Sequence, residues 1–277
     1  MAKISEKAVQ MPASAIRKLV PFADAAKKQG VKVYHLNLGQ PDIKSPVCAL
    51  DAVRNYSLEN VSYSHSAGLM ELRKGLVEKY YRKIGIDLTV DELIVTVAGS
   101  ESVNLALEIT CNPGDEVIVL EPFYTNYNTF AFMNGLTLKA IPTDIRNGFQ
   151  IPPIEEFEKA ITDKTKAILV CNPGNPTGTQ YSKESMLALG EIARKHDLFL
   201  LSDEVYREFC YTDEPHFSAM NIPGLEQNVV LIDSVSKRYN LCGARVGCIV
   251  SHNKDVMTAA MKFAQARLCP PVLGQMA

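Results

Sequence analysis

The sequence lacks any strong excess of charge, any long apolar run and any signal-peptide pattern. Its 29 Lys and Arg residues against 31 Asp and Glu give a formal net charge of −2, so the charge gives no reason to expect nucleic acid or an anionic membrane as partner. The longest uncharged stretch, 122–138, is interrupted by Asn and Thr and cannot span a bilayer. The first seven residues lack the apolar core of a signal peptide. We therefore expect a cytoplasmic protein that does not enter a membrane.

Paired cysteines and metal-ligand spacings are also missing. The seven cysteines are odd in number and include no Cys-x-x-Cys pair, and several lie in apolar, strand-like runs. This usage predicts small core residues in a reducing compartment. His65 has no second His, Cys or acidic residue at ligand spacing, so no metal site is predicted.

What is present is a regular alternation of short apolar runs and amphipathic segments after residue 88. Such alternation predicts βαβ units and an α/β fold, with a mainly parallel seven-stranded sheet that has helices on both faces. The expected strands are 93–97, 116–120, 137–141, 167–171, 198–202, 229–233 and 246–250. The expected helices are 12–28, 46–56, 69–84, 102–110, 124–134, 154–161 and 182–196.

Lys237 follows one of the predicted strands and stands close to Ser234, Ser236 and Arg245. Desolvation at a buried strand end would lower the pKa of its ammonium and make the amine nucleophilic. Hydroxyls and a guanidinium are suitable phosphate donors. An amine nucleophile beside an anion site indicates a Schiff-base site for a phosphorylated aldehyde such as pyridoxal phosphate. A solvated loop lysine is the alternative that this stretch alone leaves open.

Other polar residues follow neighbouring strands, and ligands bind at the carboxyl ends of strands in such sheets. Gly99 and Ser100 begin a predicted helix, where they indicate either an anion site or an ordinary serine cap. Tyr124 provides a ring either for stacking on a flat heterocycle or for core packing.

Two further strands end in an amide and a carboxylate. Asn175 lies in a stretch with two Asn-Pro pairs, which predicts a rigid extended loop. Asp203 is either a helix cap or a partner for a protonated heterocyclic nitrogen, and Tyr206 follows one helical turn later.

Taken in order, these residues resemble the large domain of the class I/II aminotransferases, which are fold-type-I pyridoxal-phosphate enzymes. The matching motifs are Asn-Pro-Thr-Gly at 175–178, Asp203-x-x-Tyr206, Ser234-x-Ser-Lys237 and Gly243-x-Arg245-x-Gly247. The resemblance extends over roughly residues 34–250 and implies a three-layer α/β/α fold. It divides the chain into an N-terminal arm, 1–45, that contributes to a small domain, and a cofactor-binding large domain, 46–277.

The resemblance implies a role for each matching residue. Lys237 would form an aldimine with pyridoxal 5′-phosphate and then shuttle the substrate's α-proton. Asp203 would hold the pyridinium nitrogen protonated. Asn175 and Tyr206 would bind the phenolic oxygen of the cofactor, and Tyr124 would stack on its ring.

The remaining implied contacts involve the phosphate and the substrate. The implied phosphate ligands are Gly99, Ser100, Glu101, Ser234, Ser236 and Arg245. Tyr63 matches a tyrosine that reaches the phosphate across a dimer interface, so a homodimer is expected. Gly39 and Asn175 would contact the substrate.

The implied reaction is a ping-pong transamination. An aspartate-like or aromatic L-amino acid donates its amino group to the cofactor, and a 2-oxo acid collects it. Ser100 stands where some members that act on acidic substrates carry a lysine, which weakens a specific case for aspartate. The alternatives are a C–S β-lyase, an aminocyclopropane-carboxylate synthase-like enzyme, or a non-catalytic module that senses the cofactor.

Members of this family extend about a hundred residues beyond the point that matches Ala277. That portion carries the arginine that binds the substrate α-carboxylate. The resemblance therefore implies that the chain is truncated, and we expect the chain without that arginine to be impaired or inactive.

Overall fold

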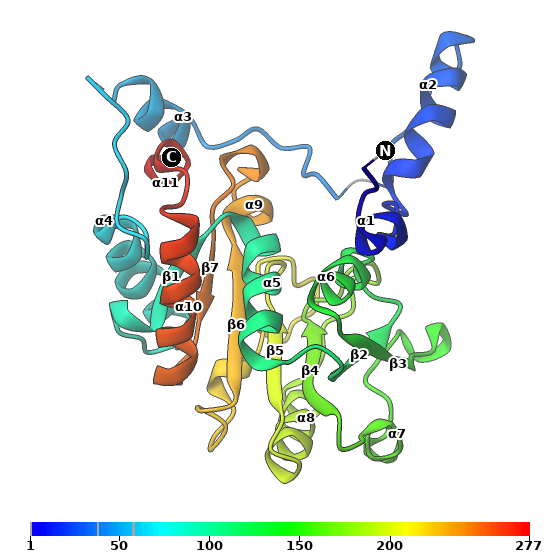
Figure 1. Ribbon diagram of the computed structural model, residues 1–277. Helices are drawn as coiled ribbons and strands as arrows, with labels where there is room; N and C mark the ends of the chain where they lie inside the picture. Colours follow the sequence, from blue (N-terminus) through cyan, green and yellow to red (C-terminus); the bar gives the residue numbers. More distant parts are fainter. Residues whose placement is uncertain (1, 38, 57–58) are drawn as a thin grey trace.

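The computed structural model describes residues 2–37, 39–56 and 59–277, and its core is one seven-stranded sheet (Figure 1). Each predicted strand is present within one or two residues of its expected bounds. The strands are β1 (Leu93–Thr96), β2 (Glu116–Glu121), β3 (Thr137–Pro142), β4 (Thr165–Cys171), β5 (Phe199–Asp203), β6 (Val229–Ser234) and β7 (Gly247–Val250). Their order across the sheet is β1-β7-β6-β5-β4-β2-β3.

The direction of β7 determines which residues meet at the site edge of the sheet. β2, β3, β4, β5 and β6 pair in parallel, whereas β7 is antiparallel to both of its neighbours, β1 and β6. The amino end of β7 therefore lies among the carboxyl ends of the other six strands. In the pairing register, Gly247 stands opposite Thr96 on one side and Ser234 on the other.

Helices cover both faces of the sheet, as the alternating pattern predicts. The helices are α1 (Glu6–Gln10), α2 (Val20–Lys28), α3 (Val47–Arg54), α4 (Met70–Lys74), α5 (Ala98–Thr110), α6 (Asn126–Asn134), α7 (Ile154–Ala160), α8 (Lys183–Lys195), α9 (Val235–Arg238), α10 (Lys254–Arg267) and α11 (Val272–Met276). The predicted helix 69–84 is a continuous run of three helical types: α4, a π-helix η2 (Gly75–Tyr81) and a 3₁₀ turn η3 (Arg82–Ile84). Helices α1, α9, α10 and α11 are not among the predicted helices, and the predicted helix 12–28 is helical only from Arg17 onward.

Two apolar cores lie on the two faces of the sheet, because side chains alternate along each strand. Val117 and Val119 of β2 pack with residues of α5, α6 and α10. Ile118 and Leu120 of the same strand pack with residues of η2, α7 and α8. This arrangement is the three-layer α/β/α architecture that the sequence predicts. None of the helices in the described ranges is long and apolar enough to cross a membrane.

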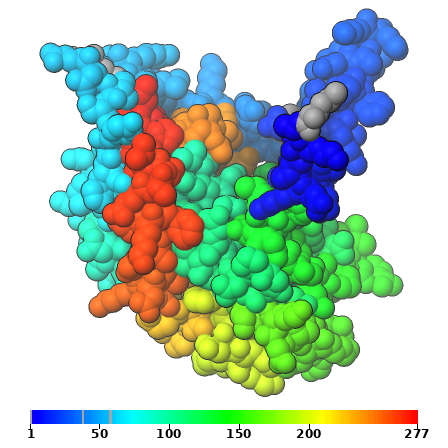
Figure 2. Space-filling model, viewed as in Figure 1, coloured from blue at the N-terminus to red at the C-terminus, as the bar shows by residue number. Residues whose placement is uncertain are grey.

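Helix α2 projects from the body of the molecule, whereas α1 lies beside α6 (Figures 1 and 2). Neither α1 nor α2 contains a buried residue. Helix α1 contacts the body through Lys7 Nζ, which donates a hydrogen bond of 2.6 Å to the carbonyl of Met133 in α6. Large apolar side chains are exposed along the arm: Ile4, Val9, Phe22, Val31, Tyr34 and Leu36.

The cysteines agree only in part with their predicted place in the core. All seven are free thiols. Cys111 and Cys248 are buried, as expected, whereas Cys48 is exposed on α3. The position of Cys48 differs because α3 has only one buried residue, Ala49.

We predict that Gly247→Ala destabilises the fold, because main chain fills the space beside its α-carbon. A methyl group there would lie 2.5 Å from the Ala98 carbonyl carbon, 2.7 Å from Gly99 N and 2.8 Å from Asp233 O. These backbone atoms must shift, so the free energy of unfolding in urea should fall by about 1–3 kcal/mol. The matched control is Gly243→Ala, whose added methyl group meets no atom within 4 Å and should change stability by less than about 0.5 kcal/mol. Equal effects of the two changes would contradict this interpretation.

Candidate active site

Lys237 lies in the single helical turn α9, which begins directly after β6. Ser234 caps this turn, because its Oγ accepts a hydrogen bond of 3.1 Å from Ser236 N. Lys237 Nζ donates a hydrogen bond of 2.6 Å to the carbonyl oxygen of Gly39, which is 198 residues away in the sequence. The Lys237 side chain is only partly buried, so its ammonium is less desolvated than the sequence pattern predicts.

Gly39, Tyr206 and Asn175 complete one group around Lys237. A Cβ atom added to Gly39 would lie 3.6 Å from Tyr206 Oη and 4.0 Å from Lys237 Nζ. Asn175 Nδ2 donates to Tyr206 Oη at 3.1 Å. The structure therefore brings together four of the predicted residues from four separate segments of the chain.

Asp203 is buried at the carboxyl end of β5, close to this group. Its Oδ1 accepts a hydrogen bond of 3.3 Å from Val205 N, and its Oδ2 accepts one of 2.7 Å from Tyr127 Oη. No lysine or arginine within residues 2–37, 39–56 and 59–277 forms an ion pair with it. Burial raises the pKa of Asp203 from 3.8 to about 6, although the Tyr127 hydrogen bond acts in the opposite direction. This carboxyl group is thus placed to accept a cationic partner.

Tyr127 is a functional candidate that the sequence motifs do not single out. It is buried, and burial raises the pKa of its hydroxyl well above the ordinary value. A buried tyrosine hydroxyl needs a hydrogen-bond partner, and its position one helical turn after Tyr124 was the available signal. Its partner, Asp203, is 76 residues away in the sequence, so no local pattern identifies it.

Tyr124 stands beside Tyr127 at the same edge of the sheet. Their rings meet edge to face, with centroids 5.5 Å apart and planes at 86°. Asn126 Nδ2 donates to Tyr124 Oη at 2.8 Å. Burial raises the pKa of Tyr124, but the side chain keeps part of its surface exposed, so its ring is available for stacking.

The first turns of α5 and α9 form a set of anion donors. The residue that precedes α5, Val97, makes no side-chain hydrogen bond to the N–H groups at the start of this helix, and such N–H groups bind anions. The position of a Cβ at Gly99 lies 3.7 Å from Ser234 Cβ, which places the two helix starts side by side. Ser234 Oγ and Ser236 Oγ are 2.7 Å apart. Ser100 is half-buried in the same first turn of α5.

The three remaining predicted phosphate ligands, Glu101, Arg245 and Tyr63, differ in their exposure and in their hydrogen-bond partners. The carboxylate of Glu101 accepts a hydrogen bond from Val97 N and pairs with Arg267 Nε at 3.3 Å, which leaves its main-chain N–H as the group for an anion. Arg245 is exposed in a left-handed conformation (φ 55°), and its Nη1 donates to Cys242 O at 3.0 Å. Tyr63 is 80% exposed, so within its own chain it is not part of the cluster.

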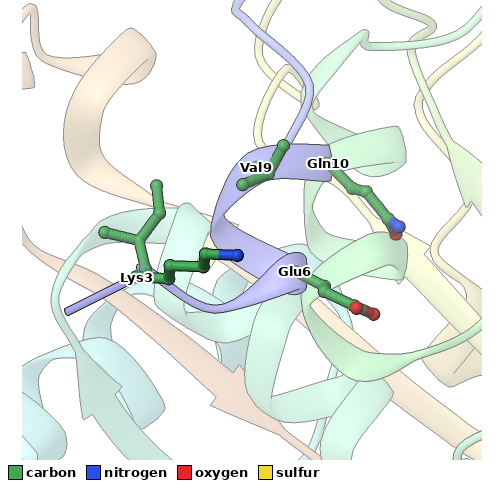
Figure 3. Close-up of a pocket in the computed structure, with 5 residues that line it drawn as sticks. Lys3, Glu6, Val9 and Gln10 are labelled. Carbon is green, nitrogen blue, oxygen red and sulfur yellow. The ribbon is translucent and has the colours of Figure 1, made fainter. Parts of the chain in front are cut away.

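Of two hollows in the structure, one is lined by residues of the predicted site and the other is not. A cavity of about 20 Å³, lined in part by Tyr127, Cys171 and Asn175, lies at the predicted site and has room for about one water molecule. A larger hollow of about 600 Å³ lies on the N-terminal arm (Figure 3) and contains none of the predicted residues. It is lined by Lys3, Ile4, Glu6, Val9 and Gln10. We therefore place the candidate site at the edge of the sheet.

The donor set at this edge fits a phosphorylated pyridine aldehyde. Lys237 offers an amine, the starts of α5 and α9 offer N–H and hydroxyl donors, and Arg245 offers a positive charge. Asp203 offers a buried carboxyl group that has no cation beside it among the described residues, and a protonated ring nitrogen would supply one. These are the groups that pyridoxal phosphate requires for its phosphate, aldehyde and ring nitrogen.

The chain also matches a known protein family. Residues 31–277 match the family model described as aminotransferase class I and II. The chain is 35% identical to the putative aminotransferase YugH of Bacillus subtilis, over 99% of this chain and 70% of that protein. It is 32% identical to the aspartate/prephenate aminotransferase of Thermus thermophilus, over 100% of this chain and 71% of that protein.

Solved structures agree in fold as well as in sequence. The aspartate aminotransferase of Thermus thermophilus with maleate superposes with a TM-score of 0.91 at 32% identity, covering 100% of this chain and 72% of that one. The alanine aminotransferase of Pyrococcus furiosus superposes with a TM-score of 0.91 at 32% identity, covering 99% of this chain and 71% of that one. The chain therefore belongs to the class I and II aminotransferase family of enzymes.

Proposed function

We propose that this protein is a pyridoxal-phosphate-dependent aminotransferase that moves the amino group of an L-amino acid to a 2-oxo acid by a ping-pong mechanism. The observation that carries the proposal is the convergence of Lys237, Tyr206, Asn175 and Gly39 next to a buried carboxyl group, Asp203. The cofactor, when bound, supplies the electron sink for the chemistry at the substrate's α-carbon. Binding, orientation and proton transfer are the tasks of the chain's own residues.

Each residue has a task that follows from its position. Lys237 Nζ would hold the cofactor at its aldehyde group and, when free, would hold and move the proton at the substrate's α-carbon. Asp203 keeps the ring nitrogen protonated, and Tyr127 holds the Asp203 carboxylate through its hydrogen bond. Asn175 and Tyr206 bind the phenolic oxygen, and Tyr124 stacks on the ring.

The phosphate is proposed to bind at the adjacent helix starts. Its ligands are Gly99, Ser100, Ser234, Ser236, Arg245 and the main-chain N–H of Glu101. The main chain of Gly39 and the side chain of Asn175 are proposed to contact the substrate, because Gly39 lies directly beside Lys237.

The proposed substrates are an aspartate-like or aromatic amino acid and a 2-oxo acid. Relatives carry the names aspartate/prephenate aminotransferase and alanine aminotransferase, and the first of these names includes an aspartate-like donor. The alternative is a lyase or synthase activity that uses the same cofactor. The products distinguish transamination from lysis, because transamination leaves the amine form of the cofactor, whereas lysis releases ammonia and a keto acid.

The exposed parts of the chain support a homodimer. Tyr63 is 80% exposed, a position suited to the phosphate of a second subunit. The arm, residues 1–45, exposes apolar side chains that a partner subunit or a small domain would cover, while residues 46–277 form the proposed cofactor-binding domain. A cytoplasmic location remains the prediction made from the sequence.

The proposal predicts that a single lysine is trapped on the cofactor. Protein mixed with pyridoxal phosphate and reduced with borohydride should carry the label on the peptide that contains Lys237, and Lys237→Ala should abolish it. Lys254→Ala, at the exposed start of α10, is the control and should label as the unmodified protein does. A label on any other residue, or none, would overturn the proposal. The amino donor is then identified by adding single amino acids from a panel and measuring which of them changes the absorbance of the bound cofactor.

Asp203 predicts a pH dependence of stability in the cofactor-free protein. Its pKa is about 6 when folded and 3.8 ordinarily, so within this window the folded chain retains a proton that the unfolded chain has released. Its contribution to stability is therefore present at low pH and is lost as the pH rises through the window. The loss should be about 2 kcal/mol between pH 4.5 and pH 7.

Urea denaturation over this pH range measures the effect, with Asp203→Asn as the comparison because an amide oxygen still accepts from Tyr127. The difference in unfolding free energy between the two proteins should change with pH by that amount. A constant difference would show that the pKa of Asp203 is not raised.

A further inference from the structure

The residues that directly follow the three proposed catalytic residues are buried and charged. Glu204 follows Asp203, Arg207 follows Tyr206, and Arg238 follows Lys237. Their side chains are 0%, 3% and 5% exposed. A buried charge is costly unless it is paired, so each of these three side chains needs a partner of opposite charge.

Arg238 is paired with Asp233, the penultimate residue of β6. Arg238 Nη2 donates to both carboxylate oxygens, at 2.9 and 2.8 Å. The same carboxylate accepts a hydrogen bond of 2.8 Å from Tyr81 Oη and one of 2.7 Å from Ser234 N. Burial acts to raise the pKa of Asp233, but Arg238 and Arg207 outweigh it and keep that pKa below its ordinary value. Asp233 is therefore ionised at neutral pH and holds Arg238 by charge.

A second set of contacts holds the Arg238 guanidinium from the side of the π-helix η2. The guanidinium carbon lies 3.9 Å from the centroid of the Tyr80 ring, a favourable cation–π distance. Arg238 Nε lies 3.5 Å from Glu208 Oε1, and Tyr80 Oη donates to the same carboxylate oxygen. Arg238 is thus held by β6 and by η2 together.

The segment that carries Asp203 and Tyr206 is held against the same part of η2. Arg207 pairs with Glu204, whose Oε1 also accepts from Ser202, Ser218 and Ala219 N. The Arg207 guanidinium carbon lies 5.4 Å from the Tyr81 ring centroid. The adjacent rings Tyr80 and Tyr81 therefore link both buried arginines, and through them both halves of the site.

The turn that carries Lys237 depends on such support because it is short. α9 has four residues, and Arg238 is the last of them. An isolated helical turn is unstable, and the cap from Ser234 holds only its first residues. The Arg238–Asp233 pair links the end of the turn back to the strand that precedes it, which closes a loop around Lys237.

We propose that Arg238 is a positioning residue for Lys237: by binding Asp233 and Tyr80 it fixes the α9 turn so that Lys237 Nζ points to the edge of the sheet at Gly39 and Tyr206. The proposal rests on the proposed function, in which Lys237 condenses with the cofactor. Arg238 itself lies behind the turn and does not contact the reacting atoms.

The test measures how fast Lys237 reacts rather than how fast the enzyme turns over. Cofactor-free protein is mixed with pyridoxal phosphate, samples are reduced with borohydride at timed intervals, and label on the Lys237 peptide is quantified by mass spectrometry. Arg238→Met should slow labelling at Lys237 about tenfold, since small misplacements of a reacting group are costly. Arg238→Lys keeps the charge but not the planar guanidinium and should give an intermediate rate.

Arg73→Met is the matched control. Arg73 is also 5% exposed, and its guanidinium donates to the carbonyl oxygens of Val90 and Leu93, at the opposite end of β1 from the site. This change should lower the free energy of unfolding in urea and leave the Lys237 labelling rate unchanged. Should Arg238→Met prevent folding, the double change Asp233→Asn with Arg238→Met removes both buried charges and should fold yet label slowly.

The outcomes separate this inference from the proposed function. If the folded Arg238 variants label Lys237 at the rate of the unmodified protein, or if Arg73→Met slows labelling as much as Arg238→Met does, Arg238 is only a stabilising residue and the inference is wrong. If the unmodified protein itself places no label on Lys237, the proposed function fails first.

Discussion

The insertion of β7 between β1 and β6 is the constraint on which the site depends. Because β7 is antiparallel to both neighbours, the chain re-enters the sheet at the edge where the other strands end. The helix starts that follow β1 and β6 are thereby brought side by side, and Arg245 is placed at the same edge. Gly247 permits this approach because main chain already fills the space that a Cβ would need. A change at this single position therefore acts on the whole anion site.

The site also keeps a carboxyl group where water cannot solvate it. Asp203 has a pKa raised by burial, and Tyr127 supplies its hydrogen bond but no positive charge. Such a group destabilises the folded chain when it ionises, and a cationic ring nitrogen would remove that cost. The same arrangement that lowers stability in the absence of cofactor thus favours binding of a protonated heterocycle.

Residues that are adjacent in the sequence belong to two different clusters: one is the candidate site and the other is a group of buried charges. Asp203, Tyr206 and Lys237 belong to the candidate site, whereas Glu204, Arg207 and Arg238 directly follow them and enter the buried charge cluster around Tyr80 and Tyr81. Both rings come from the end of the π-helix η2, a helical form that often occurs near functional sites. The geometry of the reacting groups is therefore tied to a helix that contributes no proposed catalytic residue.

The sequence by itself determined the seven strands, the α/β class and the ordered motifs that carry Asn175, Asp203, Tyr206 and Lys237. Apolar periodicity and turn residues are local signals, so they can be read without knowledge of the fold. Only the tertiary structure decided the direction of β7, the pairing of Tyr127 with Asp203, the π-helical form of η2 and the engagement of the Glu101 side chain by Arg267. The two residues of each pair lie far apart in the chain. Buried polar and charged groups need partners, and the partners become neighbours only once the strands have assembled.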